Sequence, residues 1–162
     1  MTAKDIIRKV VESSYMLVHL DVDDLADADL MVRSVPKANH IAWQLGHMAA
    51  GTRHMLGLLG REAPGLPDGF EAAHSREASA CDDPAKFRTK AEYLALMEQM
   101  KAATLAAIDA TPEGTLGDPA PEAMREYAPT VADALLVLGW HWMMHAGQFV
   151  PIRRKLGKGP QF

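Results

Sequence analysis

Residues 130–157 read TVADALLVLGWHWMMHAGQFVPIRRKLG and give the clearest indication of the fold. Thr130 and Asp133 stand three positions apart at its start, which is the spacing of a capping box at a helix N-terminus. Gly157 stands at its end, and glycine is the residue most often found just after a helix C-terminus. We therefore predict one long helix from Thr130 to about Leu156, buried over much of its surface because few of its residues are polar.

Three other segments show apolar residues at the three- and four-residue steps of a helix, and none shows the sustained alternation of a strand. They span approximately residues 3–21, 40–59 and 83–110. Asn39 is the expected N-cap of the second helix and Asp83 that of the third, because short polar side chains accept the free backbone N–H groups there. The first helix is expected to turn one stripe toward the core, comprising Ile6, Val10, Ser13 or Ser14, Leu17 and Leu20.

Two long connections rich in proline and glycine separate these helices, at residues 60–82 and 111–129. A connection of this length can pass along a bundle and return the chain parallel to the helix it left. The first is longer than a bundle usually needs, so it either covers a site or is mobile. We therefore predict an all-α fold, a four-helix bundle with long crossover connections, formed by residues 1–162 as a single domain.

Composition excludes several classes of protein. Hydrophobic residues make up 48% of the 162 residues and charged residues 23%, as in an ordinary globular protein. A net charge of −4 argues against a general nucleic-acid binder, which would carry a basic excess. Ionisable side chains within residues 131–150 argue against a membrane span, since they are costly at bilayer depth. One cysteine, Cys81, excludes an internal disulfide, so the cytoplasm is the expected compartment.

The sharpest local signal for chemistry is a histidine pair, His141 and His145, in the most apolar helix. Residues four apart lie on one side of a helix, about 6 Å apart along its axis. Two imidazoles placed in this way can bind one divalent metal ion. They can also be core histidines that hydrogen-bond within the protein, and the spacing taken alone favours that interpretation. The residue after His141 is Trp142, not the glutamate of a metalloprotease helix.

A third imidazole is available in the second helix, where His40, His47 and His54 recur every seven residues and so form one stripe. The stripe is too long for all three to bind one ion. His47 has the central and most apolar surroundings, so it is the expected ligand. Three neutral histidine ligands would leave coordination positions open, which is typical of a reactive metal site rather than a structural one. Gln44 and Gln148 are candidate polar partners for these rings.

Two blocks of sequence resemble the DinB/YfiT-like family of bacterial metalloenzymes. The first is NHIAWQLGH at residues 39–47, and the second is HWMMHAGQ at residues 141–148, followed by IRRKLG at residues 152–157. Their order and separation, and the length of the chain, also match the family. The resemblance implies a four-helix bundle in up-down-down-up order, often as a homodimer. It also implies one divalent metal ion, zinc or nickel, bound by three histidines. These correspond to His47, His141 and His145.

The resemblance also implies a reaction class. Characterised relatives in the family include S-transferases and isomerases that use low-molecular-weight thiols. The leading hypothesis is therefore a thiol-dependent S-transferase, in which the metal ion activates a thiol cosubstrate against a small electrophilic substrate. A second hypothesis is a metal-dependent hydrolase or isomerase that needs no thiol, and a third is a non-catalytic metal-binding or stress-response module. The nucleophile would be a thiol or a water molecule at the metal ion, so no catalytic side chain is assigned.

Overall fold

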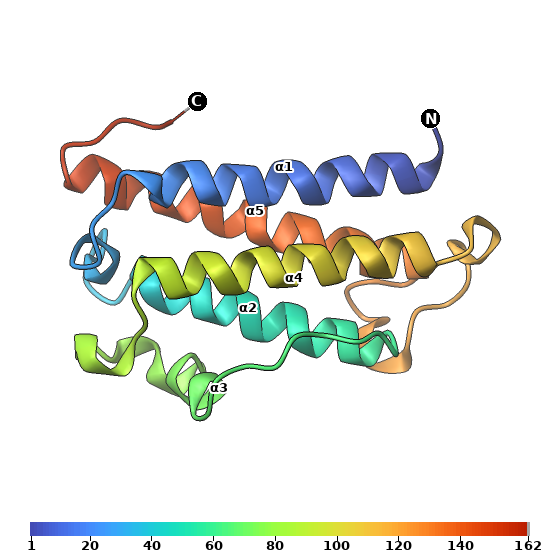
Figure 1. Cartoon of the computed structure of the whole chain (residues 1–162), viewed down its shortest axis with the longest axis horizontal. Helices are drawn as coiled ribbons and strands as arrows, with labels where there is room; N and C mark the ends of the chain where they lie inside the picture. The colour runs from blue at the N-terminus through green and yellow to red at the C-terminus, as the bar shows by residue number, and fades with distance from the viewer. Residues whose placement is uncertain (162) are drawn as a thin grey trace.

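Four long helices form the body of the protein in the computed structural model, which describes residues 1–161 (Figure 1). Their bounds are Ala3–Asp23 for α1, Ile41–Leu58 for α2, Lys90–Ala110 for α4 and Val131–Lys155 for α5. A one-turn helix, α3, covers Phe70–Ala73 in the connection between α2 and α4. Residues 1–161 contain no β-strand, only one isolated bridge between Pro119 and Thr130. The predicted all-α fold is confirmed.

Short 3₁₀ turns shape the connections between the long helices. They lie at Asp29–Met31, Glu77–Ala80, Pro84–Lys86, Glu113–Thr115 and Glu122–Met124. None of the helices within the described residues is long and apolar enough to cross a lipid bilayer.

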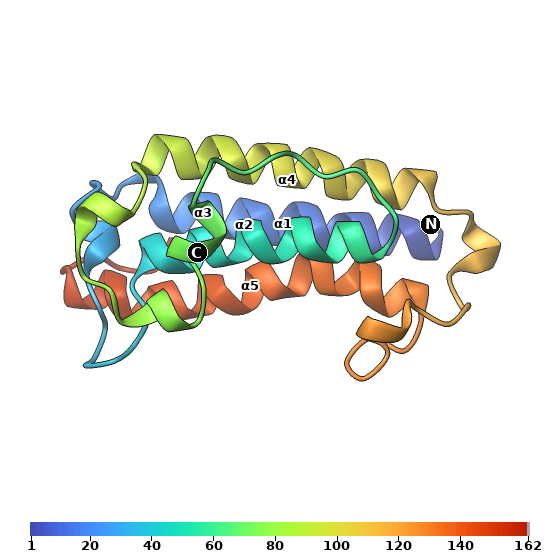
Figure 2. The ribbon, with the colours of Figure 1, turned by 90° about the horizontal axis from the view of Figure 1, so that it is seen from below.

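The four long helices follow an up-down-down-up order. α1 and α5 run side by side in the same direction, and α2 and α4 run together in the opposite direction (Figure 1). Because α2 and α4 are parallel, the chain between them must return along the bundle, as the crossover connection does in Figure 2. α1 also packs against α4 and α2 against α5, which closes the helices into a ring around one core. The predicted topology is confirmed.

Both predicted ends of α5 are confirmed. Thr130 Oγ1 accepts a hydrogen bond from the backbone N–H of Asp133 at 3.2 Å, and a carboxylate oxygen of Asp133 accepts one from the N–H of Thr130 at 3.0 Å. Gly157 has a φ of 75°, the left-handed conformation that ends a helix and that glycine adopts without strain. The histidine pair therefore lies well inside a helix whose two ends are both fixed.

The N-cap of α2 differs from the prediction. His40 takes this place and not Asn39, because the Nδ1 atom of His40 accepts the backbone N–H of Trp43 at 3.1 Å. The ring of His40 is fully buried, and its other nitrogen, Nε2, donates to the carbonyl of Cys81 at 3.1 Å. Histidine is not among the residues preferred at this position, so the cap depends on the carbonyl that the connection brings to it.

The start of α4 also differs from the prediction. α4 begins at Lys90 and not near Asp83, because Thr89 and Glu92 form a complete capping box. Asp83 instead caps a short 3₁₀ turn, where its carboxylate accepts the backbone N–H of Ala85 at 3.0 Å. Asp83 and Thr89 are both possible N-caps and lie six residues apart. The helix starts at Thr89, because Glu92 returns a second hydrogen bond to the backbone of this cap residue.

The buried face of α1 lies one position away from the predicted one. Ile6 and Leu20 are 51% and 37% exposed. The hydrophobic residues buried on α1 are Ile7, Val11, Tyr15, Val18 and Val22. α1 carries two apolar stripes side by side, so periodicity alone does not choose between them. The second stripe faces the core because it includes Tyr15, whose ring stacks on Trp142 of α5 at a centroid distance of 4.3 Å.

The connection between α2 and α4 is anchored on both helices. His74 at its centre is buried against Gly46 of α2, so closely that a Cβ atom on residue 46 would lie 2.0 Å from the ring. The Nδ1–H of His74 donates to the carbonyl of Phe70 at 2.7 Å, and its Nε2 accepts the hydroxyl of Tyr93, on α4, at 2.7 Å. Only glycine at position 46 allows the connection to approach α2 in this way.

Candidate metal centre

Three of the seven histidines meet between α2 and α5. One side-chain nitrogen from each of His47, His141 and His145 lies within 4.8 Å of the other two. The centroids of their rings are 4.9 to 5.4 Å apart. The fold therefore brings together the three residues that the sequence analysis selected, from two helices that are far apart along the chain.

Helix geometry explains why these rings converge. The two histidines of α5 are four residues apart, so they lie on the same side of that helix. α2 packs antiparallel to α5 (Figure 1). It contributes His47 from its second turn. Gly51, one turn further along α2, lies against His141, and a Cβ atom there would be 3.5 Å from the ring. The small residue lets the two helices approach each other at the cluster.

Gln44 orients His145. The Nδ1–H of His145 donates a hydrogen bond to Oε1 of Gln44 at 2.8 Å, and Nε2 of Gln44 donates to the carbonyl of Asn39 at 2.8 Å. Both side chains are buried. This chain of bonds assigns the proton of His145 to Nδ1 and leaves Nε2 free to bind a metal ion. Of the two candidate polar partners, Gln44 occupies this place, whereas Gln148 is exposed.

His47 lies flat against Trp43, one turn earlier in α2. The centroids of the two rings are 4.8 Å apart, and their planes differ by only 8°. The indole is itself fixed, because its Nε1 donates to the carbonyl of Ser75 in the connection at 2.9 Å. The stack holds the imidazole by its face and leaves its edge, which carries the nitrogen atoms, free. Sequence reasoning did not assign this role to Trp43, although its position four residues before His47 is the signal that would reveal it.

The surroundings of His141 show whether a metal ion fits the cluster. Its Nδ1 atom is buried and has no hydrogen-bond partner within residues 1–161. A buried polar atom without a partner costs about 1–3 kcal/mol. The lone pairs of three unprotonated imidazole nitrogens repel one another when they lie close together. A cation between them removes this repulsion, because each nitrogen can then coordinate the ion. Three imidazoles are also a donor set that suits transition metals, so these residues fit a divalent metal ion.

Burial keeps all three imidazoles neutral. Desolvation lowers the pKa of His47, lowers that of His141 to about 4 and lowers that of His145 to about 3. Neighbouring imidazoles add to the effect on His141 and His145, because like charges repel each other. Only a neutral histidine binds a metal ion, so at neutral pH the rings are in the binding form.

The four remaining histidines lie outside the cluster. His40 caps α2, and His74 is hydrogen-bonded within the connection and to α4. His54 is exposed and His19 is half-buried. The stripe of three histidines in α2 therefore contributes only its central member, His47, to the cluster.

Comparison with known proteins identifies the family. The family model of the DinB superfamily matches residues 11–149, a range that includes all three clustered histidines. This chain belongs to the DinB superfamily. The resemblance inferred from the two sequence blocks is confirmed. No curated protein sequence matches this DinB-superfamily chain significantly.

Two solved structures share the fold of this DinB-superfamily chain. One is a conserved protein from Enterococcus faecalis, with 16% sequence identity, 98% of this chain and 99% of that chain covered, and a TM-score of 0.69. The other is YfiT from Bacillus subtilis, with 19% identity, 96% of this chain and 89% of that chain covered, and a TM-score of 0.63. YfiT is described as a probable metal-dependent hydrolase with an unusual four-helix bundle topology. At these identities the comparisons show the fold and not a shared reaction.

Proposed function

We propose that this DinB-superfamily protein is an enzyme that binds one divalent metal ion through His47, His141 and His145. The observation that carries the proposal is the convergence of three neutral imidazoles from two helices, one of them oriented by Gln44. Three protein ligands leave coordination positions free, which distinguishes catalytic from structural metal sites. We propose zinc or nickel as the ion, because imidazole nitrogens suit both.

The charge of the site favours an anionic ligand from outside the protein. The cluster consists of three histidines, and no aspartate or glutamate among residues 1–161 belongs to it. Neutral ligands leave both positive charges of a divalent ion uncompensated. A bound ion of this kind lowers the pKa of a thiol or a water molecule that reaches it, and so supplies a nucleophile at neutral pH.

We infer that the reaction is the transfer of a low-molecular-weight thiol cosubstrate to a small electrophilic substrate. The sulfur forms a bond to the electrophilic carbon, the leaving group departs with the electron pair of the bond that breaks, and the thiol proton passes to solvent. His47 and His141 are half-buried and His145 is buried, so the proposal requires a small molecule to approach past the rings of the first two.

Thiol consumption with and without a metal chelator tests this function. The purified, untagged protein is first analysed for bound zinc and nickel and is then assayed with a small thiol and an aryl halide. We expect turnover to require the ion and to be lost in His47→Ala, His141→Ala and His145→Ala. His54→Ala is the matched control, because this histidine is exposed on the same helix as His47 and lies outside the cluster. Equal rates with and without chelator would contradict the proposal.

A metal-dependent hydrolase is the second candidate, and the description of YfiT favours it. This candidate, like an isomerase that uses the same ion, predicts product formation without any thiol. The third candidate, a non-catalytic metal-binding or stress-response module, predicts that His141→Ala lowers the melting temperature of a protein that shows no turnover. Omitting the thiol from the assay separates the first candidate from the second, and the thermal melt identifies the third.

We further propose that the protein works on small molecules as a cytoplasmic homodimer. α1 and α5 lie side by side, and both expose apolar side chains. Among these are Ile6, Leu20, Trp140 and Met143, each 37–51% exposed. A second copy of the chain presents the same uncharged side chains, so a two-fold interface would cover them on both copies at once. Light scattering gives the molar mass in solution, and the mass of a monomer at all accessible concentrations would contradict the proposal.

A further inference from the structure

A cavity lies at the end of the bundle remote from the histidine cluster. It has a volume of about 370 Å³ and lies where α2 and α4 end and α5 begins. Leu59, in its wall, is twelve residues beyond His47, about 18 Å along α2, and Leu135 is six residues before His141, about 9 Å along α5, while no clustered histidine lines the cavity. The cavity is therefore separate from the proposed metal site. The polar side chains that line it are Arg61, Thr111, Thr115 and Arg125.

The two arginines in this cavity have no acidic partner. Nη2 of Arg61 donates to Oγ1 of Thr111 at 3.1 Å, and Nε of Arg125 donates to the carbonyl of Ala120 at 2.6 Å. These bonds use one nitrogen of each guanidinium group. Within residues 1–161, neither group lies within 4.0 Å of a carboxylate, and no aspartate or glutamate lines the cavity. Two positive charges therefore share one cavity without a counter-charge.

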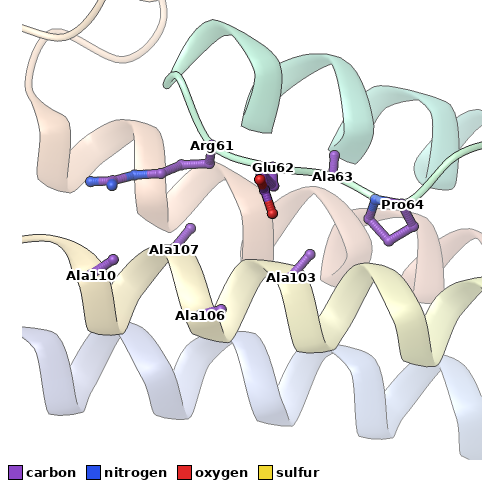
Figure 3. A pocket seen from close by; sticks show the side chains of 8 residues that line it. All are labelled: Arg61, Glu62, Ala63, Pro64, Ala103, Ala106, Ala107 and Ala110. Carbon is purple, nitrogen blue, oxygen red and sulfur yellow. The ribbon is translucent and has the colours of Figure 1, made fainter.

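The end of α2 fixes the position of Arg61. Gly60 has a φ of 66°, and the backbone N–H of Arg61 donates a hydrogen bond to the carbonyl of Leu56 at 2.9 Å. Together these two features end α2. Figure 3 draws a neighbouring pocket that shares only Arg61 with this cavity, and in it the Arg61 side chain extends away from Glu62, whose carboxylate points toward α4. The neighbouring glutamate therefore does not neutralise the guanidinium group of Arg61.

The rest of the cavity wall is apolar or already hydrogen-bonded. Its aliphatic surface comes from side chains that include Leu59, Val131 and Leu135. The hydroxyls of Thr111 and Thr115 donate to main-chain carbonyls of their own segments at 2.8 and 2.9 Å. The unused donors thus belong to the two guanidinium groups, and a ligand must bring the acceptors and the negative charge.

We propose that this cavity binds a small organic anion whose phosphate or carboxylate group lies between Arg61 and Arg125. A guanidinium group presents paired N–H donors that match the oxygen atoms of either anion. The anion removes the repulsion between the two arginines, and an apolar body attached to it packs against the aliphatic wall. Because the ligand contacts both the end of α2 and the connection before α5, its binding stabilises the folded protein.

Titration of the isotopically labelled, metal-free protein tests the proposal by nuclear magnetic resonance. The probes are inorganic phosphate, phenyl phosphate and benzoate at constant ionic strength. Amide signals around Thr111, Thr115 and Arg125 are expected to shift, and phenyl phosphate is expected to bind more tightly than inorganic phosphate. Comparing phenyl phosphate with benzoate distinguishes the two anionic groups. Arg61→Gln and Arg125→Gln are each expected to weaken binding roughly tenfold, because a charge-assisted contact is lost.

Arg154→Gln is the matched control for these variants. This arginine is exposed, has no carboxylate within 4.0 Å among the described residues, and lies in the last turn of α5, so its loss is expected to leave the affinity unchanged. Arg125 is exposed, so its variant is expected to keep the fold, as a circular dichroism melt verifies. Absence of any shift, shifts centred on His47, or an equal loss of affinity in all three variants would overturn the proposal. These results do not test the metal-dependent activity proposed above, which the thiol-consumption assay tests separately.

Discussion

Replacement of Gln44 by methionine tests the hydrogen bond that orients His145. Methionine has a similar length and volume, so it fills the same space, but it lacks the amide oxygen that accepts the 2.8 Å bond. The Nδ1–H of His145 is then buried without a partner, and the carbonyl of Asn39 loses its donor as well. The ring is free to turn, and Nε2 no longer has a fixed direction.

Two effects of known size are expected from this substitution. Loss of a partner on the second nitrogen of a metal-binding histidine lowers metal affinity about 10–100-fold, which corresponds to about 1.4–2.7 kcal/mol. The unpaired N–H also lowers the free energy of unfolding of the metal-free protein by about 1–3 kcal/mol. The first effect requires metal binding at this cluster, and the second does not.

Zinc affinity is measured by competition with a chromophoric chelator, and the free energy of unfolding is measured in urea without metal. Gln148→Met is the matched control, because Gln148 is exposed on α5 and is expected to affect neither quantity. If Gln44→Met binds zinc as tightly as the unchanged protein, Gln44 does not orient a metal ligand and the reasoning is refuted.

Four further predictions concern α2, the stack on His47 and the end of α1. Gly46→Ala is expected to destabilise the protein by about 1–3 kcal/mol in urea, because the new Cβ would lie 2.0 Å from the ring of His74. Gly57→Ala, where nothing lies within 4 Å, is expected to stabilise it by roughly 1 kcal/mol. Trp43→Phe keeps an aromatic face for the stack but loses the indole hydrogen bond, so a loss of about 1 kcal/mol is expected in the same assay. Burial raises the pKa of Asp21, and the guanidinium group of Arg153, 3.8 Å away, only partly opposes that shift, so folding is favoured most below the ordinary pKa of an aspartate and less as pH rises through the higher pKa of the folded protein. Asp21→Asn should therefore raise the melting temperature at pH 7 and not in acid, and an equal rise at both would contradict this account.

Local sequence was sufficient at both ends of α5, but not at the start of α4, where Asp83 and the capping box of Thr89 offer competing local signals. The capping box of Thr130 and Asp133 and the left-handed Gly157 define α5 through contacts within a few residues, so the sequence predicts both ends. The four-residue spacing of His141 and His145 likewise sets their relative position through helix geometry alone. The meeting of this pair with His47 depends on how two helices pack, and periodicity does not determine packing.

Two of the errors, and one choice left open by the sequence, lie where distant segments decide the outcome. α1 has two apolar stripes, and the choice between them depends on the partner that Tyr15 finds on α5. His40 becomes the cap of α2 because the carbonyl of Cys81 satisfies its second nitrogen. The role of Gln44 was one of two possibilities, and only the packing of α2 against α5 shows which glutamine reaches His145. In each case the deciding atom lies dozens of residues away in the chain.

The separation of the clustered histidines along the chain affects when the site can form. His47 is on α2, whereas the other two rings are on α5, which is made after both long connections. A nascent polypeptide emerging from the ribosome therefore lacks a complete set of ligands until α5 has been synthesised and has docked. An ion that needs all three rings can be bound only after the whole bundle has assembled. If the cluster binds such an ion, the molar ratio of metal to protein in a preparation would report the fraction of molecules that are correctly folded.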